Sequence, residues 1–116
     1  NYLEKRNIII GSRRTSIQLE TYFWHQLDII VDQEQLNLNL LCYELHTRRN
    51  DYSMAQSLRL FIVMYFKEKT EAMAKSHPLG ADYKLFEASA DSPSIIHVLN
   101  VFSHHTQHID ERHQKN

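Results

Sequence analysis

The sequence predicts a mainly α-helical fold that begins with one short β-strand and ends in a helical extension. Side chains over residues 13–20 alternate between polar and less polar types, which is the pattern of a strand with one buried face. From Thr21 onward the apolar residues recur at helical spacing instead. A lone strand has an open edge that must be paired or blunted. We therefore expect it to pair with the same strand of a second copy, in an intertwined homodimer with a two-stranded antiparallel ribbon.

The charge of the chain is nearly balanced overall but uneven along its length. The 116 residues include 13 Lys and Arg against 14 Asp and Glu, for a net charge of −1. Residues 1–12, which we expect to form an N-terminal basic arm, hold Lys5 and Arg6, and Arg13 and Arg14 follow directly. Such a cluster can contact phosphate even in a neutral protein. The alternative is an ordinary solvated terminus.

The single cysteine and the hydropathy pattern indicate in which cellular compartment we expect the protein. One cysteine, Cys42, excludes an intrachain disulfide framework and fits a reducing compartment. It falls among leucines at helical spacing, which predicts a buried thiol rather than a nucleophile. No apolar run approaches the roughly 20 residues that span a bilayer. We expect a cytoplasmic, nucleoid-associated protein without membrane contact.

Residues 13–69 are predicted to form one compact strand-plus-helices unit. The strand turns one set of side chains inward and the other outward, namely Thr15, Ile17 and Leu19 against Arg14, Ser16 and Gln18. A first helix is predicted over about residues 21–35, and a second over about 38–47 with Asn37 as its N-cap. Ser53 and Gln56 form a capping box for a third helix that runs to about Lys69.

These short helices leave few places to bury so many large apolar side chains. We therefore expect two chains to share one core, formed by Ile17, Leu19, Phe23, Trp24, Leu27, Leu41, Leu45 and Phe61.

Residues 70–116 are predicted to form a helical extension for oligomerisation or partner binding. Breaks at residues 76–80 and 91–93 separate a last helix that starts near Pro93. On that helix His97, His104 and His108 fall close to one line. His104 and His108 have the spacing of two metal ligands, but no third ligand is evident. We therefore predict a solvated polar face, with no metal and no cofactor.

Three motifs occur in the order found in a known family. Residues 14–20 read R-T-S-I-Q-L-E, followed by F-W at residues 23–24 and by Leu27. This segment resembles the R-T-S-hydrophobic-x-L-E strand motif of a bacterial subgroup of the ribbon-helix-helix (Arc/MetJ-type) DNA-binding family. Residues 36–41 are similar to the turn and second-helix start of that subgroup, and residues 53–61 to its N-L-S-S-A-L-R-V-F segment. The resemblance covers about residues 6–67, and the chain departs from it by lacking Gly before the second helix.

The resemblance implies a homodimer whose two-stranded ribbon enters the major groove of duplex DNA. The groove is about 12 Å wide and admits such a ribbon. By position, Arg14, Ser16 and Gln18 would face the bases. Arg pairs with guanine and Gln with adenine through two hydrogen bonds, and Ser serves either base. Phosphate contacts are expected from the basic N-terminal residues and from the start of the second helix, namely Lys5, Arg6, Arg13, Asn37, Leu38 and Asn39.

The function expected from these features is sequence-specific DNA binding by a transcriptional regulator, such as a repressor. Two alternatives remain open. One is a plasmid or nucleoid accessory DNA-binding protein, and the other is an antitoxin-like module whose residues 70–116 bind a partner protein. The chain has two glycines, no G-x-S-x-G and no H-E-x-x-H motif, so we do not expect an enzyme.

Overall fold

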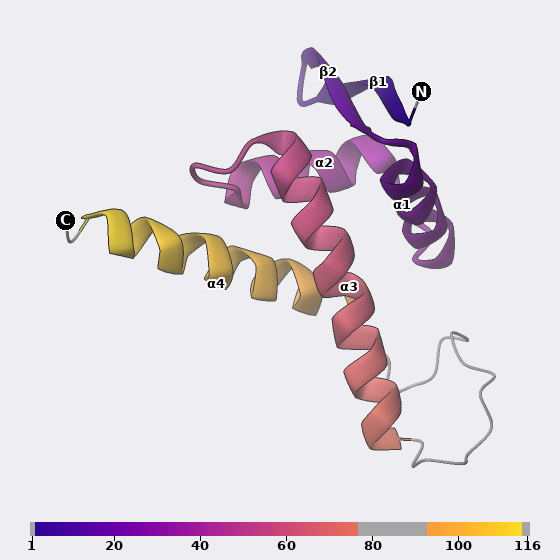
Figure 1. The fold of residues 1–116 in the computed structure, drawn as a ribbon, viewed down its shortest axis with the longest axis vertical. Coiled ribbons are helices and arrows are strands. Elements are labelled where there is room, and N and C mark those ends of the chain that lie inside the picture. The colour runs from indigo at the N-terminus through magenta and orange to yellow at the C-terminus, as the bar shows by residue number, and fades with distance from the viewer. Residues whose placement is uncertain (1, 77–92, 115–116) are drawn as a thin grey trace.

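The described part of the chain folds into a β-hairpin followed by four helices (Figure 1). The structure, a computed structural model, describes residues 2–76 and 93–114, with side chains described up to residue 74 and from 93 to 107. The elements are β1 (Leu3–Ile10), β2 (Arg13–Glu20), α1 (Thr21–Gln33), α2 (Leu38–Arg48), α3 (Met54–Ser76) and α4 (Ile95–Gln114). The hairpin lies at one end, above α1 and α2, and α3 runs through the middle of the molecule with α4 crossing it.

The hairpin corrects the expectation of a single strand without a partner in its own chain. β1 and β2 pair antiparallel, with Leu3 opposite Glu20 and Ile10 opposite Arg13. Gly11 and Ser12 form the two-residue turn between them, and Gly11 has φ 65. Glycine reaches positive φ without a steric penalty and suits the first central position of such a turn. Residues 3–10 are therefore a strand of the sheet and not a loose arm.

The predicted alternation of β2 is confirmed and extends to β1. Ile17 and Leu19 are buried, whereas Arg14, Ser16 and Gln18 are exposed. In β1, Ile8 and Ile10 are buried and the odd-numbered residues from Lys5 to Ile9 are exposed. The hairpin thus has an inner face on the core and an outer face toward solvent.

The helices begin where their capping residues predict. The Asn37 side chain accepts a hydrogen bond from the Leu40 amide at 3.1 Å and caps α2. The capping box before α3 is also confirmed, because the Ser53 hydroxyl accepts from the Gln56 amide at 3.1 Å and the Gln56 side chain accepts from the Ser53 amide at 2.9 Å. α1 ends at Gln33, two residues earlier than expected, and α3 continues to Ser76, well past Lys69.

One chain buries the residues that were expected to need a second chain. Seven of the eight expected dimer-core residues are at most 3% exposed, namely Ile17, Leu19, Trp24, Leu27, Leu41, Leu45 and Phe61. Phe23 is half-buried and packs against the same core. Two elements supply the missing cover: β1 adds Ile8 and Ile10, and α4 adds Val98, Leu99 and Phe102. A second chain is therefore not needed to bury these residues, and their burial alone does not argue for a shared core.

The C-terminal helix exists as predicted, and its apolar face is used inside the same chain. It packs against α2 and α3. The Thr106 hydroxyl, which is buried, donates a hydrogen bond to the Arg48 carbonyl at 2.6 Å, at the C-terminal end of α2. His97 contacts Glu68 of α3 at 2.8 Å. The break expected at residues 76–80 lies, from residue 77 on, outside the described residues, as do the side chains of His108 and Ile109.

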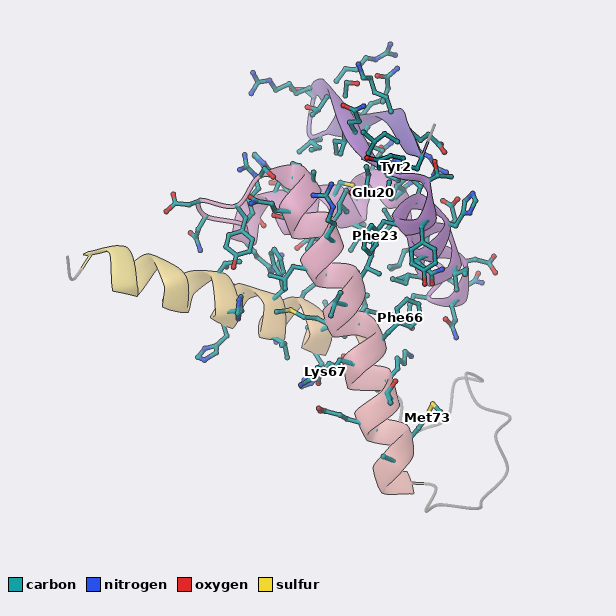
Figure 2. The ribbon with its side chains drawn as sticks, in the orientation of Figure 1. Tyr2, Glu20, Phe23, Phe66, Lys67 and Met73 are labelled. Carbon is teal, nitrogen blue, oxygen red and sulfur yellow. The ribbon has the colours of Figure 1, made fainter. Side chains whose placement is uncertain are left out.

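Two ion pairs fix α3 against the first part of the chain. Arg59 of α3 makes two hydrogen bonds to Glu20, at 2.9 and 3.2 Å, where β2 runs into α1 (Figure 2). Near the other end of α1, Lys69 lies 3.0 Å from Glu34, which also accepts the Tyr65 hydroxyl. No described helix is long and apolar enough to cross a membrane.

Candidate nucleic-acid interface

The outer face of the hairpin brings together six exposed side chains. Three come from β2 and are the predicted base contacts, and three come from β1. The register pairs them as Lys5 with Gln18, Asn7 with Ser16, and Ile9 with Arg14. Side chains opposite each other across an antiparallel pair lie about 5 Å apart. The arrangement is therefore a continuous polar surface on a two-stranded ribbon.

This outer face is cationic. Lys5 and Arg14 lie on this face, and Arg13 lies beside the turn opposite Ile10; all three are exposed, and within the described part of the chain none of them has an ion-pair partner. The two carboxylates of the hairpin, Glu4 and Glu20, contact Arg6 and Arg59 instead. The hydrogen bonds from Arg59 lower the pKa of Glu20, so this group stays ionised and paired at neutral pH. Figure 2 shows nitrogen-tipped side chains projecting from the hairpin away from the helices.

The structure places Arg6 on the opposite face of β1 from Lys5. Its guanidinium makes two hydrogen bonds to Asp28, at 2.8 and 3.1 Å, and a third to Glu4. It also lies 4.7 Å from the centre of the Trp24 ring. The hydrogen bond to Asp28 raises the pKa of Arg6 further above its ordinary value. Arg6 therefore holds the hairpin on α1, and its guanidinium is engaged there instead of being available to a phosphate group.

The start of α2 lies beside the hairpin. The Asn39 side chain accepts the Ile9 amide of β1 at 3.0 Å, and the Asn37 side chain caps its own helix. In both side chains the amide oxygen is occupied as an acceptor, which leaves the NH2 group to donate, and Leu38 packs against the core. This position also offers the backbone: the first amides of α2, at Leu38 and Asn39, are donors at the positive end of the helix.

Two outward residues, Asn7 and Ile9, were missed from the sequence. The run Ile8-Ile9-Ile10 hides the alternation that would mark a strand. The signal was the Gly11-Ser12 pair, because Gly-Ser between two strand-like runs is a common hairpin turn. With that turn in place, the register fixes which residues of β1 share a face with Arg14, Ser16 and Gln18.

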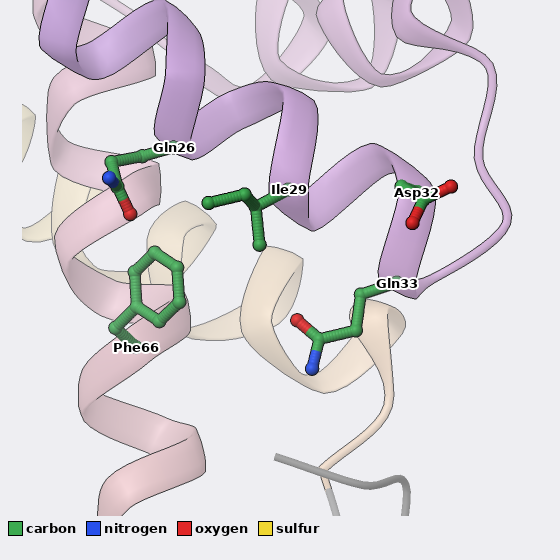
Figure 3. A pocket seen from close by; sticks show the side chains of 5 residues that line it. All are labelled: Gln26, Ile29, Asp32, Gln33 and Phe66. Carbon is green, nitrogen blue, oxygen red and sulfur yellow. The ribbon is translucent and has the colours of Figure 1, made fainter.

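The remaining features of the molecule lie away from this face. No group of three or more potential metal ligands occurs among the described residues. An open hollow of about 490 Å³ lies between α1 and α3, with Ile29 and Phe66 facing each other across it (Figure 3). Its other lining residues are Gln26, Asp32 and Gln33, so it is separate from the hairpin.

Comparison with known proteins agrees with this geometry. A family model described as a ribbon-helix-helix domain matches residues 3–66, which span β1 to the middle of α3. Neither the curated proteins nor the solved structures that were searched give a match. Proteins with this domain generally bind DNA, as transcription regulators or antitoxins, and typically form dimers. The match covers more than half of the sequence, and the chain belongs to the ribbon-helix-helix domain family.

Proposed function

We propose that this chain binds duplex DNA in a sequence-specific manner and acts as a bacterial transcriptional regulator, with the outer face of the hairpin in the major groove. One observation carries the proposal. Arg14, Ser16 and Gln18 project from one exposed face, flanked by cationic side chains that no described carboxylate neutralises. The motif over residues 14–20 supports placing the chain in the bacterial subgroup with the R-T-S strand.

The base contacts follow from hydrogen-bonding chemistry. Arg14 can donate two hydrogen bonds to the O6 and N7 atoms of guanine, and Gln18 can pair with the N6 and N7 atoms of adenine. Ser16 lies between them and can serve either base. Along a strand these residues are spaced by about 6.8 Å, which is close to two base-pair steps of duplex DNA. The three side chains would therefore contact bases in alternate steps.

The phosphate contacts in the proposal are Lys5, Arg13 and the backbone amides at the start of α2. Lys5 and Arg13 lie toward the two ends of the hairpin, and both side chains are exposed and positively charged. The α2 amides are held next to β1 by the Asn39 bond to Ile9. A helix start combines free N–H donors with the positive end of the helix dipole, so it stabilises an anion that approaches it.

Homodimerisation is part of the proposal, with support from the dimers typical of the family. β2 keeps one edge without a strand neighbour in the described chain. The hydrogen bond from the Thr21 amide to the Tyr2 carbonyl at 2.7 Å makes these two opposed residues a hydrogen-bonded pair. Hydrogen-bonded and non-hydrogen-bonded pairs then alternate along the two strands. With this register the backbone groups of Arg14, Ser16 and Gln18 point away from β1. A second copy can pair there, or it can associate through the helices.

The alternative role as a partner-binding module is not favoured by a specific observation. The last helix belongs to the segment that was expected to bind such a partner, and its residues Val98, Leu99 and Phe102 are buried against α2 and α3.

The proposed function is tested by selecting duplexes from a random pool with the full chain. We expect one sequence to be enriched, and its affinity to fall steeply with salt as phosphate-bound counterions are released. Sedimentation of the bound and free protein measures the stoichiometry, which we expect to be two chains per site. Binding without any sequence preference would contradict the proposal.

A further inference from the structure

The open edge of β2 determines which strands meet at the centre of a dimer that pairs there. Within the described chain β2 has a strand neighbour on one side only, which is β1. The backbone groups of Arg14, Ser16 and Gln18 point to the other side. A second copy related by two-fold symmetry therefore places its own β2 beside this one. The sheet then has the two β2 strands at its centre and one β1 on each flank.

The width of this four-stranded sheet separates the two kinds of strand. Neighbouring strands lie about 4.8 Å apart. The two central strands therefore fit together within a groove about 12 Å wide. The two outer strands are three spacings apart, at about 14 Å, which exceeds that width. Each β1 would thus lie over an edge of the groove, beside the phosphates, and not above the bases.

The start of α2 independently places phosphate next to β1. The Ile9 amide donates to the Asn39 side chain at 3.0 Å. Ile9 belongs to the odd-numbered residues of β1, whose backbone groups point away from β2 in this register. The helix start, with its anion-binding amides, therefore lies along the outer edge of β1. Across the surface, β1 thus lies between the base-facing strand and a phosphate-binding helix start.

Two side chains of β1 on the outer face can donate hydrogen bonds to phosphate. Lys5 is already among the proposed phosphate contacts. Asn7 is exposed on the same face, and no described residue hydrogen-bonds its side chain. Its NH2 group has two donor hydrogens, and Asn side chains are common donors to phosphate oxygens.

We propose that each β1 strand of the dimer runs along a phosphate backbone at the edge of the major groove, where Asn7 donates a hydrogen bond to a phosphate oxygen. β1 then positions the central β2 pair on the duplex and carries no sequence information of its own. This inference rests on the proposed function, because it assigns a positioning role to a further strand of the same surface.

The first test compares Asn7→Ala with the wild type on the selected duplex and on an unrelated one. Asn100→Ala is the matched control, since Asn100 is exposed on α4, away from the hairpin. We expect Asn7→Ala to bind both duplexes about 5- to 100-fold more weakly, because each of two chains loses one hydrogen bond. The slope of affinity against salt should stay unchanged, because a neutral donor releases no counterion.

A charge at the same position gives a second readout. Asn7→Lys should steepen the dependence of affinity on salt by about two phosphate contacts per dimer, one from each chain. Asn100→Lys adds the same charge away from the hairpin and should leave this slope as in the wild type.

Uncharged phosphates locate the contact on the DNA. Replacing each phosphate of the selected duplex in turn by a methylphosphonate removes one anionic oxygen. We expect two positions, related by the two-fold symmetry of the site, at which the wild type loses affinity and Asn7→Ala loses much less. Selection from a random pool with Asn7→Ala should still enrich the wild-type sequence.

Cross-linking of the free dimer tests the order of the strands without DNA. The native thiol Cys42 is buried, so a cysteine introduced on the hairpin is the reactive one. A bis-maleimide reagent that reaches only between neighbouring strands should join two Ser16→Cys chains, because the β2 strands are adjacent. It should not join two Asn7→Cys chains across about three strand spacings. A cross-link at Asn7→Cys and none at Ser16→Cys would overturn the inference.

The outcomes on DNA separate this inference from the function on which it rests. If Asn7→Ala binds with wild-type affinity, or selects a different sequence, the inference is overturned and the proposed function still stands on the β2 residues. A wild-type chain that selects no sequence would overturn both. Thermal unfolding of each variant verifies that lost binding reflects a lost contact and not a lost fold.

Discussion

The Asn39 side chain accepts a hydrogen bond from the Ile9 amide at 3.0 Å, which holds the first turn of α2 against the outer edge of β1. Two parts of the proposed DNA surface, the hairpin and the helix start, are thereby fixed relative to each other. An edge strand otherwise presents unpaired backbone groups to solvent or to another chain, and this bond covers one of them.

Replacing Asn39 by Ala should loosen that junction. The bond is exposed to solvent, so we expect the free energy of unfolding to fall by only about 0.5–1 kcal/mol. DNA affinity should fall as well, because the helix start would no longer be held beside the hairpin. Hydrogen exchange of the Ile9 amide measures the junction directly and should become faster. Asn39→Asp keeps an acceptor oxygen and serves as the control, and unchanged exchange in the Ala variant would contradict the assignment.

The neighbours Lys5 and Arg6 should respond differently to substitution, because they lie on opposite faces of β1. Arg6→Ala removes the paired hydrogen bonds to Asp28 and the contact with Trp24. We expect a loss of about 1–2 kcal/mol in the free energy of unfolding. Lys5→Ala should leave stability unchanged, weaken binding to all DNA sequences alike, and reduce the slope of affinity against salt by about one phosphate contact. If Lys5→Ala lowered stability and Arg6→Ala lowered only DNA binding, the result would contradict the placement of Lys5 on the outer face and Arg6 on the inner face of the hairpin.

Removing the C-terminal helix should destabilise the whole domain. The sequence predicted that residues 13–69 form one compact unit, whereas Val98, Leu99 and Phe102 belong to the common core. We expect Phe102→Ala alone to cost about 3–5 kcal/mol in urea unfolding. Ile96→Ala, on the exposed side of the same helix, should cost almost nothing. A truncated chain with wild-type unfolding behaviour would contradict this packing.

The thiol of Cys42 reports on the opening of this core. The residue is fully buried in α2, and burial raises its pKa to about 12. The native thiol therefore stays protonated at pH 8, and a maleimide reagent should label it only when the domain opens. The raised pKa also predicts that stability falls as pH rises from about 9 toward 12, because the unfolded chain loses this proton first. Rapid labelling of the native protein at pH 8 would contradict the burial.

The strand and helix starts were predictable because local chemistry determines them. Asn37 and the Ser53–Gln56 pair cap their helices within their own neighbourhood of the sequence. The alternation in β2 identified its outward residues for the same reason. None of these features depends on where the rest of the chain lies.

What the sequence did not predict depends on contacts between distant segments. Arg6 looked like a free basic residue, and only the pairing of Arg6 opposite Ile17 shows that it shares the inner face of the hairpin. The apolar surplus looked like a dimer core, because the contributions of β1 and of α4 to one chain's core arise from tertiary packing. The role of the Asn39 side chain likewise required the position of Ile9, thirty residues earlier.

The most direct test of the central claim is to replace Arg14, Ser16 and Gln18 together by Ala and to measure binding to the selected duplex. All three side chains point away from the core, so circular dichroism and thermal unfolding should match the wild type. Singly, Arg14→Ala and Gln18→Ala should each weaken specific binding by about 1–3 kcal/mol. The account predicts that the triple variant folds normally and retains only weak, salt-sensitive binding without sequence preference. A folded triple variant that binds the same duplex with wild-type affinity and specificity would contradict it.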